Sequence, residues 1–124
     1  MRIVPYYAAV LALLFLYLSY RVIEGRRTNK VSLGGGGIPA LERVVRVHAN
    51  FAEYAPFALV LLGMAELRGV PGWALHALGA ALVLGRASHA YGVSRTPEMF
   101  RFRIGGMMLT FFVLAAAAVA LLLT

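Results

Sequence analysis

The chain of 124 residues contains no cysteine, and its acidic residues are few. Without cysteine there is no disulfide bridge, no thiolate metal site and no protein thiol nucleophile, so any sulfur chemistry must come from a ligand. The 5 Asp and Glu residues stand against 12 Lys and Arg, which leaves a net charge of +7. In a soluble protein this excess would suggest nucleic acid as a partner, but the positions of the basic residues indicate another cause.

Charge is missing altogether from three long stretches of the chain. Ile3–Tyr20, Val70–Gly85 and Ile104–Thr124 carry none, and Tyr54–Ala65 adds a fourth apolar block. With 61% hydrophobic residues and a mean hydropathy of +0.79, the chain is too apolar for an ordinary soluble domain. Crossing the hydrocarbon layer takes about 20 residues per helix, so four crossings use most of the chain. The sequence therefore predicts an all-α membrane protein, a four-transmembrane-helix bundle forming one domain over residues 1–124.

The expected helices span about 4–28, 40–67, 71–94 and 97–123. We expect the first to be a retained helix rather than a signal peptide, because its apolar run is long and Arg2 is the single charge before it. The fourth is expected to start at Thr96, Pro97 and Glu98, which supply a capping hydroxyl, a proline at the first position and an acid in the first turn.

The basic residues gather around the first and third connections between these helices. They are Arg21, Arg26, Arg27, Lys30, Arg43, Arg46, Arg86, Arg95, Arg101 and Arg103. Only Arg2 and Arg68 remain for the other face. By the positive-inside rule, both termini should lie outside and both basic connections in the cytoplasm, which for a bacterial protein means the inner membrane. The basic residues then orient the chain in the membrane and contact lipid headgroups, and no nucleic acid partner is expected.

A polar run, Glu42–Tyr54, enters an otherwise apolar membrane segment. On a helix, Glu42, Arg43, Arg46, Asn50 and Glu53 fall within one sector, with Tyr54 near its edge. An ionisable side chain at mid-depth costs at least about 2.5 kcal/mol, so Glu53 needs a partner, a wet cavity or a ligand. The run therefore predicts a functional site.

Further polar residues should lie at the same cytoplasmic boundary as this run. They are Arg26, Arg27, Arg86, Arg101, Arg103, Glu98, His48 and His89. The surplus of arginine favours an anion, since arginine binds carboxylates in bidentate fashion and stays charged when partly desolvated. Lipid headgroups are the alternative for the arginines at the helix ends, and a small zwitterion with an extra carboxylate fits the whole set.

Other kinds of site find less support in the sequence. His48 and Glu53 are not spaced as a pair of metal ligands, and the neighbouring arginines would repel a cation, so no metal is expected. No Ser or Cys stands near a His and an acid in the setting of a hydrolase triad.

Four segments together resemble the MAPEG family, the membrane-associated proteins of eicosanoid and glutathione metabolism. They are VIEGRRTNKVS, ERVVRVHANFAEYAPF, GRASHAYGVSR and MFRFRIGGM, which span roughly Arg21–Met107. The resemblance implies a homotrimer of four-helix subunits that holds glutathione, as co-substrate, between neighbouring subunits near the cytoplasmic side. It also implies activation of the glutathione thiol for attack on hydrophobic electrophiles or lipid hydroperoxides.

Residue by residue, the resemblance assigns a binding set and one catalytic arginine. The glutathione contacts that it implies are Arg26, Arg46, His48, Asn50, Glu53, Tyr54, Arg86 and His89. The arginine that stabilises the thiolate is expected to be Arg101, with Arg103 as the alternate position. His48 lies about 160° from the sector of Asn50, so it could contribute only from a neighbouring subunit. Val93 stands where the family often has a tyrosine.

Two alternatives to a glutathione transferase or peroxidase remain at the level of sequence. A small multidrug exporter is also a short four-helix protein with an intramembrane glutamate, but its essential acid is expected in the first helix, which carries no charge between Ile3 and Tyr20. A non-catalytic scaffold with the MAPEG fold is the second alternative.

Overall fold

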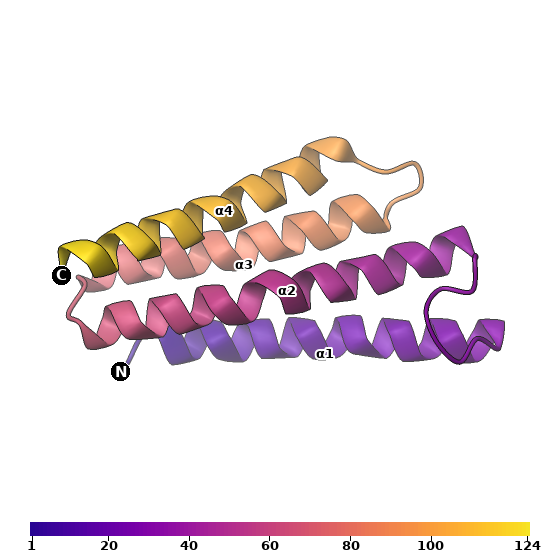
Figure 1. Ribbon diagram of the computed structural model, residues 1–124, viewed down its shortest axis with the longest axis horizontal. Coiled ribbons are helices and arrows are strands. Elements are labelled where there is room, and N and C mark those ends of the chain that lie inside the picture. Colours follow the sequence, from indigo (N-terminus) through magenta and orange to yellow (C-terminus); the bar gives the residue numbers. More distant parts are fainter.

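The protein consists of four α-helices and no strand in a computed structural model that describes residues 1–124. The helices are α1 (Val4–Asn29), α2 (Pro39–Leu67), α3 (Gly72–Ser94) and α4 (Phe100–Leu123). They alternate in direction, so that both termini lie at one end of the bundle and the 30–38 and 95–99 connections at the other (Figure 1). The predicted all-α four-helix bundle is confirmed.

The bundle is arranged around the pair α2 and α3. Both α1 and α4 pack against this pair, while α1 and α4 do not contact each other. The core between the helices is apolar, with Leu11, Leu62, Leu82 and Val113 almost completely buried. Large apolar side chains also cover the outside of the single chain, as expected where helices meet hydrocarbon rather than water. By length and composition, α1 and α4 each qualify as a membrane span.

Close approach of α3 and α4 depends on two glycines that face each other. A Cβ atom added to Gly106 would collide with the carbonyl oxygen of Gly85 and would lie 2.5 Å from the backbone nitrogen of His89. Small residues at such crossings let helix backbones approach closely, which is a common way of packing helices in membranes. The contact sets the height of α4 relative to α3.

The start of α1 is held by a residue from the end of α2. The carboxylate of Glu66 accepts hydrogen bonds from the backbone N–H groups of Ile3 and Val4 at 2.9 to 3.0 Å. Those N–H groups have no partner within their own helix, and a negative charge there also complements the helix dipole. Glu66 therefore ties the two helix ends together at the end of the bundle that carries the termini.

The predicted start of the fourth helix is wrong by three residues. The helix begins at Phe100, its N-cap is Met99, and no side chain caps it. Glu98 instead forms ion pairs with Arg43 and Arg103, and the Met99 N–H donates to the carbonyl of Gly92. These tertiary contacts hold 95–99 as an irregular connection, where local capping preference alone favoured another turn of helix.

Candidate functional site

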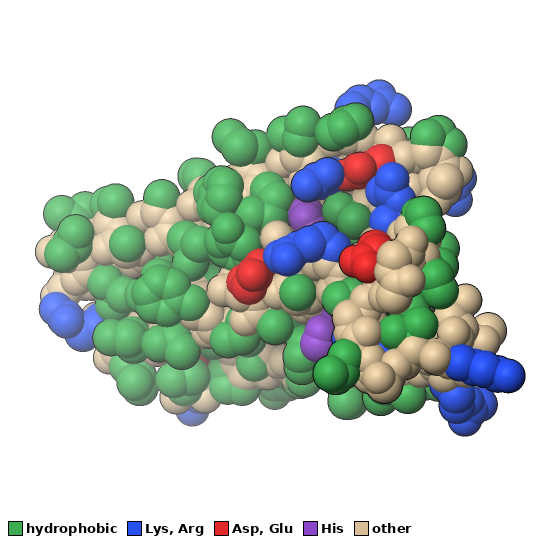
Figure 2. All heavy atoms as spheres, turned by 45° about the vertical axis from the view of Figure 1, so that its right-hand side comes forward, with side chains coloured by type: hydrophobic (Ala, Val, Ile, Leu, Met, Phe, Trp, Pro, Cys, Tyr) green, Lys and Arg blue, Asp and Glu red, His purple; other side chains and the backbone are tan.

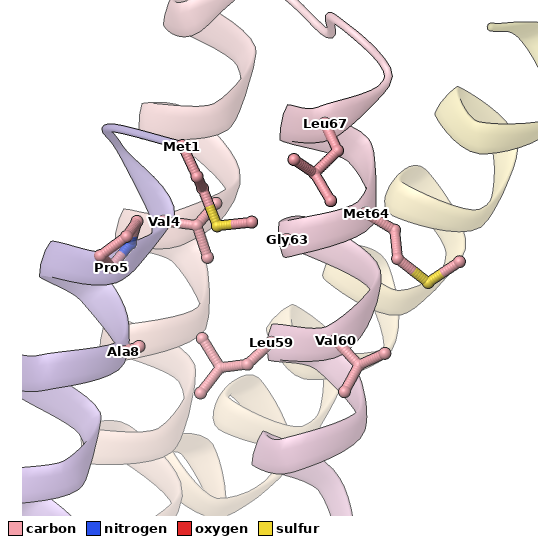
Figure 3. A pocket seen from close by; sticks show the side chains of 9 residues that line it. All are labelled: Met1, Val4, Pro5, Ala8, Leu59, Val60, Gly63, Met64 and Leu67. Carbon is pink, nitrogen blue, oxygen red and sulfur yellow. The ribbon is translucent and has the colours of Figure 1, made fainter.

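The largest cavity of the chain has no charged side chain in its walls. It is an apolar groove of about 450 Å³ between α1 and α2, at the end with the termini, and its walls include Val4, Leu59, Val60 and Leu67 (Figure 3). A site that binds a polar group or moves a proton must therefore lie elsewhere.

The charged side chains gather at the opposite end of the bundle. Figure 2 shows basic and acidic groups with a histidine among them in one hollow, bordered by apolar surface. The hollow contains a cavity of about 270 Å³, here called the polar pocket, and its walls are Glu42, Arg43, Arg46, Val93, Glu98 and Arg103. The residues come from α2, from the end of α3, from the 95–99 connection and from the start of α4, so the pocket exists only because the fold joins them.

Glu98 holds one wall of the polar pocket together. Its two carboxylate oxygens pair with Arg103 Nη1 at 2.5 Å and with Arg43 Nη1 at 3.3 Å. Arg43 Nη1 also donates to the carbonyl oxygen of Val93. The hydrogen bond from Arg103, supported by Arg43, keeps the pKa of the Glu98 carboxyl below its usual range. Glu98 is thus an anion that fixes two arginines in place.

Glu53, an ionisable residue in a membrane segment, has Arg46 as its ion-pair partner. Their side chains form an ion pair at 2.5 Å, two turns apart along α2. The position of Glu53 differs from the expectation of a buried acid, because its side chain is 55% exposed in the single chain and that of Arg46 is 53% exposed. An ion pair on the outward surface of a membrane helix needs water or a polar neighbour to cover it.

The most deeply buried charge is Arg86 on α3, which is 1% exposed. Its Nη1 donates to Asn50 Oδ1 at 2.5 Å and to the Asn50 carbonyl oxygen at 3.3 Å, and its Nε donates to Thr110 Oγ1 at 3.1 Å. Its guanidinium carbon lies 5.7 Å from the centre of the Tyr54 ring. A cation that is buried against neutral acceptors and an aromatic ring fixes Asn50 and Tyr54 on one side of α2.

His89 lies one turn beyond Arg86 on α3 and is 4% exposed. No hydrogen bond or ion pair within the chain involves its ring nitrogens. Because no fully buried side-chain nitrogen or oxygen of the chain lacks a partner, these two nitrogens must keep some contact with solvent. The backbone of α4 at Gly106 covers it closely, since a Cβ atom on that glycine would lie 2.8 Å from the Cβ of His89. The ring sits next to the polar pocket without being part of its wall.

The two candidate arginines of α4 face different directions. Arg103 lies in the wall of the polar pocket and pairs with Glu98. Arg101 is exposed, makes no ion pair or side-chain hydrogen bond within the chain, and shares its helix face with the exposed residues Ile104 and Met108. Within one chain the fold therefore brings Arg103, and not Arg101, to the other site residues.

Arg26 and His48 stand apart from the polar pocket, on the side of the chain formed by α1 and α2. His48 stacks on Phe15 and hydrogen-bonds Ser19 Oγ at 3.1 Å. Arg26 Nε donates to the carbonyl oxygen of Gly34 in the first connection. The single chain thus carries two separate polar surfaces, one with most of the predicted binding residues and one with these two.

One residue of the Arg86 network, Thr110, was not predicted from the sequence. The stretch Ile104–Thr124 carries no charge and no polar stripe, yet Thr110 within it is fully buried. Its hydroxyl donates to the carbonyl oxygen of Gly106 and accepts from Arg86. The available signal was its spacing, since Thr110 lies four residues after Gly106 and so on the face of α4 that meets α3.

Four largely apolar helices, with an arginine-rich polar pocket at one end of the bundle, define an integral membrane protein. Comparison with known families identifies the kind of membrane protein. The sequence model of the MAPEG family matches residues 4–123. The chain belongs to the MAPEG family.

Curated relatives extend this result. The chain is 38% identical over 104 residues to inner membrane protein YecN of Escherichia coli strain K12, covering 84% of this chain and 78% of that protein. The same figures apply to inner membrane protein YecN of Escherichia coli O6:H1. The location of these relatives supports an inner membrane location here, and the family match gives no support to the alternative of a small multidrug exporter.

Proposed function

We propose that the protein is a membrane glutathione transferase, with glutathione peroxidase activity as a second reaction of the same site. The observation that carries the proposal is the polar pocket, in which three arginines and two glutamates surround a cavity of about 270 Å³. Membership of a family that includes glutathione transferases supports it.

The charges of the pocket match those of glutathione, which has two carboxylates and one ammonium group. Arg43, Arg46 and Arg103 supply guanidinium groups for the carboxylates, since arginine forms paired hydrogen bonds with them. Glu53 supplies a carboxylate for the ammonium group. Asn50 and Tyr54 are positioned by Arg86 and add neutral hydrogen-bonding groups beside the charged ones.

A second copy of the chain would complete the site. The Arg46–Glu53 pair is half exposed on the surface of one subunit, and Arg26 and His48 lie on a different face. In a homotrimer, the α1–α2 face of one subunit would cover the polar pocket of the next. That arrangement places Arg26 and His48 beside glutathione and removes the ion pair from lipid.

The chemical task is to lower the pKa of the glutathione thiol. A free thiol has a pKa of about 8.5, so at neutral pH the nucleophilic thiolate is a minority species. An arginine beside the sulfur favours the charged form, and each unit of pKa corresponds to about 1.4 kcal/mol. The thiolate then displaces a leaving group such as chloride from an apolar electrophile, forming the C–S bond. In the peroxidase reaction, two glutathione molecules reduce a hydroperoxide to an alcohol and water and become the disulfide.

Binding of glutathione to purified protein in detergent tests the proposal directly. Calorimetry should detect binding to the wild type, and Glu53→Ala should weaken it at least about tenfold by removing a charged partner. Glu24→Ala is the matched control, because Glu24 pairs with Arg27 on α1, away from the pocket. Conjugation of a chlorinated nitrobenzene should follow the same order.

Two results would contradict the proposal in different ways. If the wild type bound no glutathione, the transferase assignment would be wrong and the non-catalytic scaffold would be favoured. If native mass spectrometry gave a single chain of 13.4 kDa rather than three copies, the shared site would be wrong.

A further inference from the structure

A second polar groove lies between α1 and α3, at the same end of the bundle as the polar pocket. Its volume is about 360 Å³ and it shares no residue with that pocket. One half is apolar and includes Leu14, Leu18 and Ala87, while the other half holds Arg21 and Arg95 with hydroxyl groups around them. We call it the α1–α3 groove.

The two arginines of the groove are held in place by neutral groups. The guanidinium carbon of Arg21 lies 6.0 Å from the centre of the Tyr17 ring, and that of Arg95 lies 5.4 Å from the centre of the Tyr91 ring. Arg21 Nη1 also donates to Ser94 Oγ at 3.0 Å. Cation–π contacts of this kind orient a guanidinium group while leaving most of its N–H donors unused.

No carboxylate neutralises these two charges. Neither arginine forms an ion pair, whereas Arg43 and Arg103 in the polar pocket both pair with Glu98. No acidic residue lines the α1–α3 groove at all. Two positioned guanidinium groups with free donors and no counter-charge are complementary to an anion, above all to a phosphate.

The apolar half of the groove determines what kind of anion fits. Leu14 and Arg21 are seven residues apart on α1, so the groove runs about 10 Å from its charged half toward the middle of the membrane. Tyrosines at the charged half are typical of the boundary between headgroups and hydrocarbon. A ligand that fills the groove is therefore charged at one end and apolar at the other.

We propose that the α1–α3 groove binds one anionic phospholipid, whose phosphate lies between Arg21 and Arg95 and whose acyl chain follows Leu14, Leu18 and Ala87. Basic pockets between membrane helices are a common form of lipid headgroup site. A second copy of this chain is a poor occupant, because the chain has a net charge of +7 and would bring further positive charge to unpaired arginines. The site is independent of glutathione.

Native mass spectrometry of the purified protein with added lipid tests this site. The probes are phosphatidylglycerol and phosphatidylcholine with identical acyl chains. The wild type should retain phosphatidylglycerol in preference to phosphatidylcholine, and the double variant R21Q/R95Q should bind phosphatidylglycerol roughly 30-fold more weakly. R21K/R95K keeps both charges and should keep most of the binding.

The matched control is R2Q/R68Q, which removes the same charge from the other end of the bundle. It should retain phosphatidylglycerol like the wild type. Equal loss in both double variants would overturn the site, because net charge alone would then explain binding. Equal retention of the two lipids by the wild type would also contradict the proposal, because the arginines would then not distinguish an anionic headgroup from a zwitterionic one. Retention of neither lipid by the wild type would also overturn the proposal.

Discussion

Arginines in this protein differ in what surrounds each guanidinium group, and the surroundings indicate what each one does. Arg43 and Arg103 share the carboxylate of Glu98, so they are fixed and partly neutralised. Arg86 is buried against neutral acceptors and supports Asn50. Arg101 has no partner within the chain, although it is only two residues from Arg103. The number of arginines alone therefore says little, and the contacts separate binding, support and surface roles.

The difference between the two α4 arginines leads to a paired prediction. Arg103→Ala should lower kcat/KM for conjugation about 100-fold, because it removes positive charge from the pocket where the thiolate would lie. Arg101→Ala should have the smaller effect, because Arg101 does not line the polar pocket of its own chain. The ultraviolet absorbance of bound glutathione thiolate distinguishes the two variants from a simple loss of binding. A larger loss of thiolate in Arg101→Ala would assign the role to Arg101, acting toward the neighbouring subunit.

The lowered pKa of Glu98 leads to a prediction of how the stability of the fold depends on pH. Its folded-state pKa lies below its usual value of about 4.3, so its contribution to stability is fully present above that value. The contribution is lost as the pH falls through the lowered folded-state pKa. The midpoint of thermal denaturation in detergent should therefore fall at acid pH, and Glu98→Gln should show a weaker dependence. Glu24→Gln, on the exposed side of α1, should behave like the wild type.

At the scale of the helices, the contact between α3 and α4 decides where the site residues of these two helices meet. Gly106 and Gly85 bring the helix backbones together, which covers His89 and places Thr110 against Arg86. A shift of α4 by one turn would move Arg103 away from the pocket by about 5.4 Å. Packing of two small residues thus controls the geometry of charged groups one to three turns away.

Two neighbouring glycines of α4 provide a matched test of this packing. Gly106→Ala should destabilise the protein by about 1 to 3 kcal/mol, because the added Cβ meets backbone atoms of α3 that cannot move aside. Gly105→Ala should be neutral or stabilising by up to about 1 kcal/mol, since nothing lies within 4 Å of its Cβ position and alanine favours helix. Thermal denaturation in detergent measures both. Equal effects of the two substitutions would mean that α4 packs on α3 through another face.

For the whole molecule, the arrangement of the helices separates the charged end from the end with the termini. The 30–38 and 95–99 connections lie together at the charged end, as alternating helices require (Figure 1). Both polar grooves of the chain open near this end, and the apolar groove of Figure 3 lies at the other. The asymmetry of charge therefore coincides with an asymmetry of sites.

Reporter fusions test how this asymmetry is placed in the membrane. A reporter after Thr124 should be active outside the cytoplasm, and one inserted in the glycine-rich 34–37 segment should be active inside, because the basic connections resist translocation. The two fusions control each other, since a failure to insert would leave both inside. The reversed pattern would place the polar pocket on the outer side, where the supply of reduced glutathione is different.

Much of the fold followed from the sequence because its signals are local. Runs without charge predicted four membrane helices with boundaries within three residues, and the spacing of Asn50 and Glu53 placed them in one polar sector of α2. The start of α4 was missed, because the capping preference of Thr96 competes with the ion pairs that Glu98 forms with Arg43 and Arg103. Arg43 is 55 residues from Glu98 along the chain, so local sequence does not reveal this contact. Thr110 was missed because a single hydroxyl in an Ala- and Leu-rich helix has no periodicity to reveal it.

By itself, the sequence determined that the chain is an all-helical membrane protein with positive charge concentrated around two connections and a polar stripe on its second helix. Those properties depend on composition and on helical periodicity, which act over a few residues. Only the tertiary structure decided that Arg103 rather than Arg101 joins the polar pocket, that Thr110 supports Arg86, and that Arg21 and Arg95 meet in a separate groove. Periodicity gives the angle of a side chain on its own helix, but the register between helices, set here by Gly85 and Gly106, decides which side chain it meets.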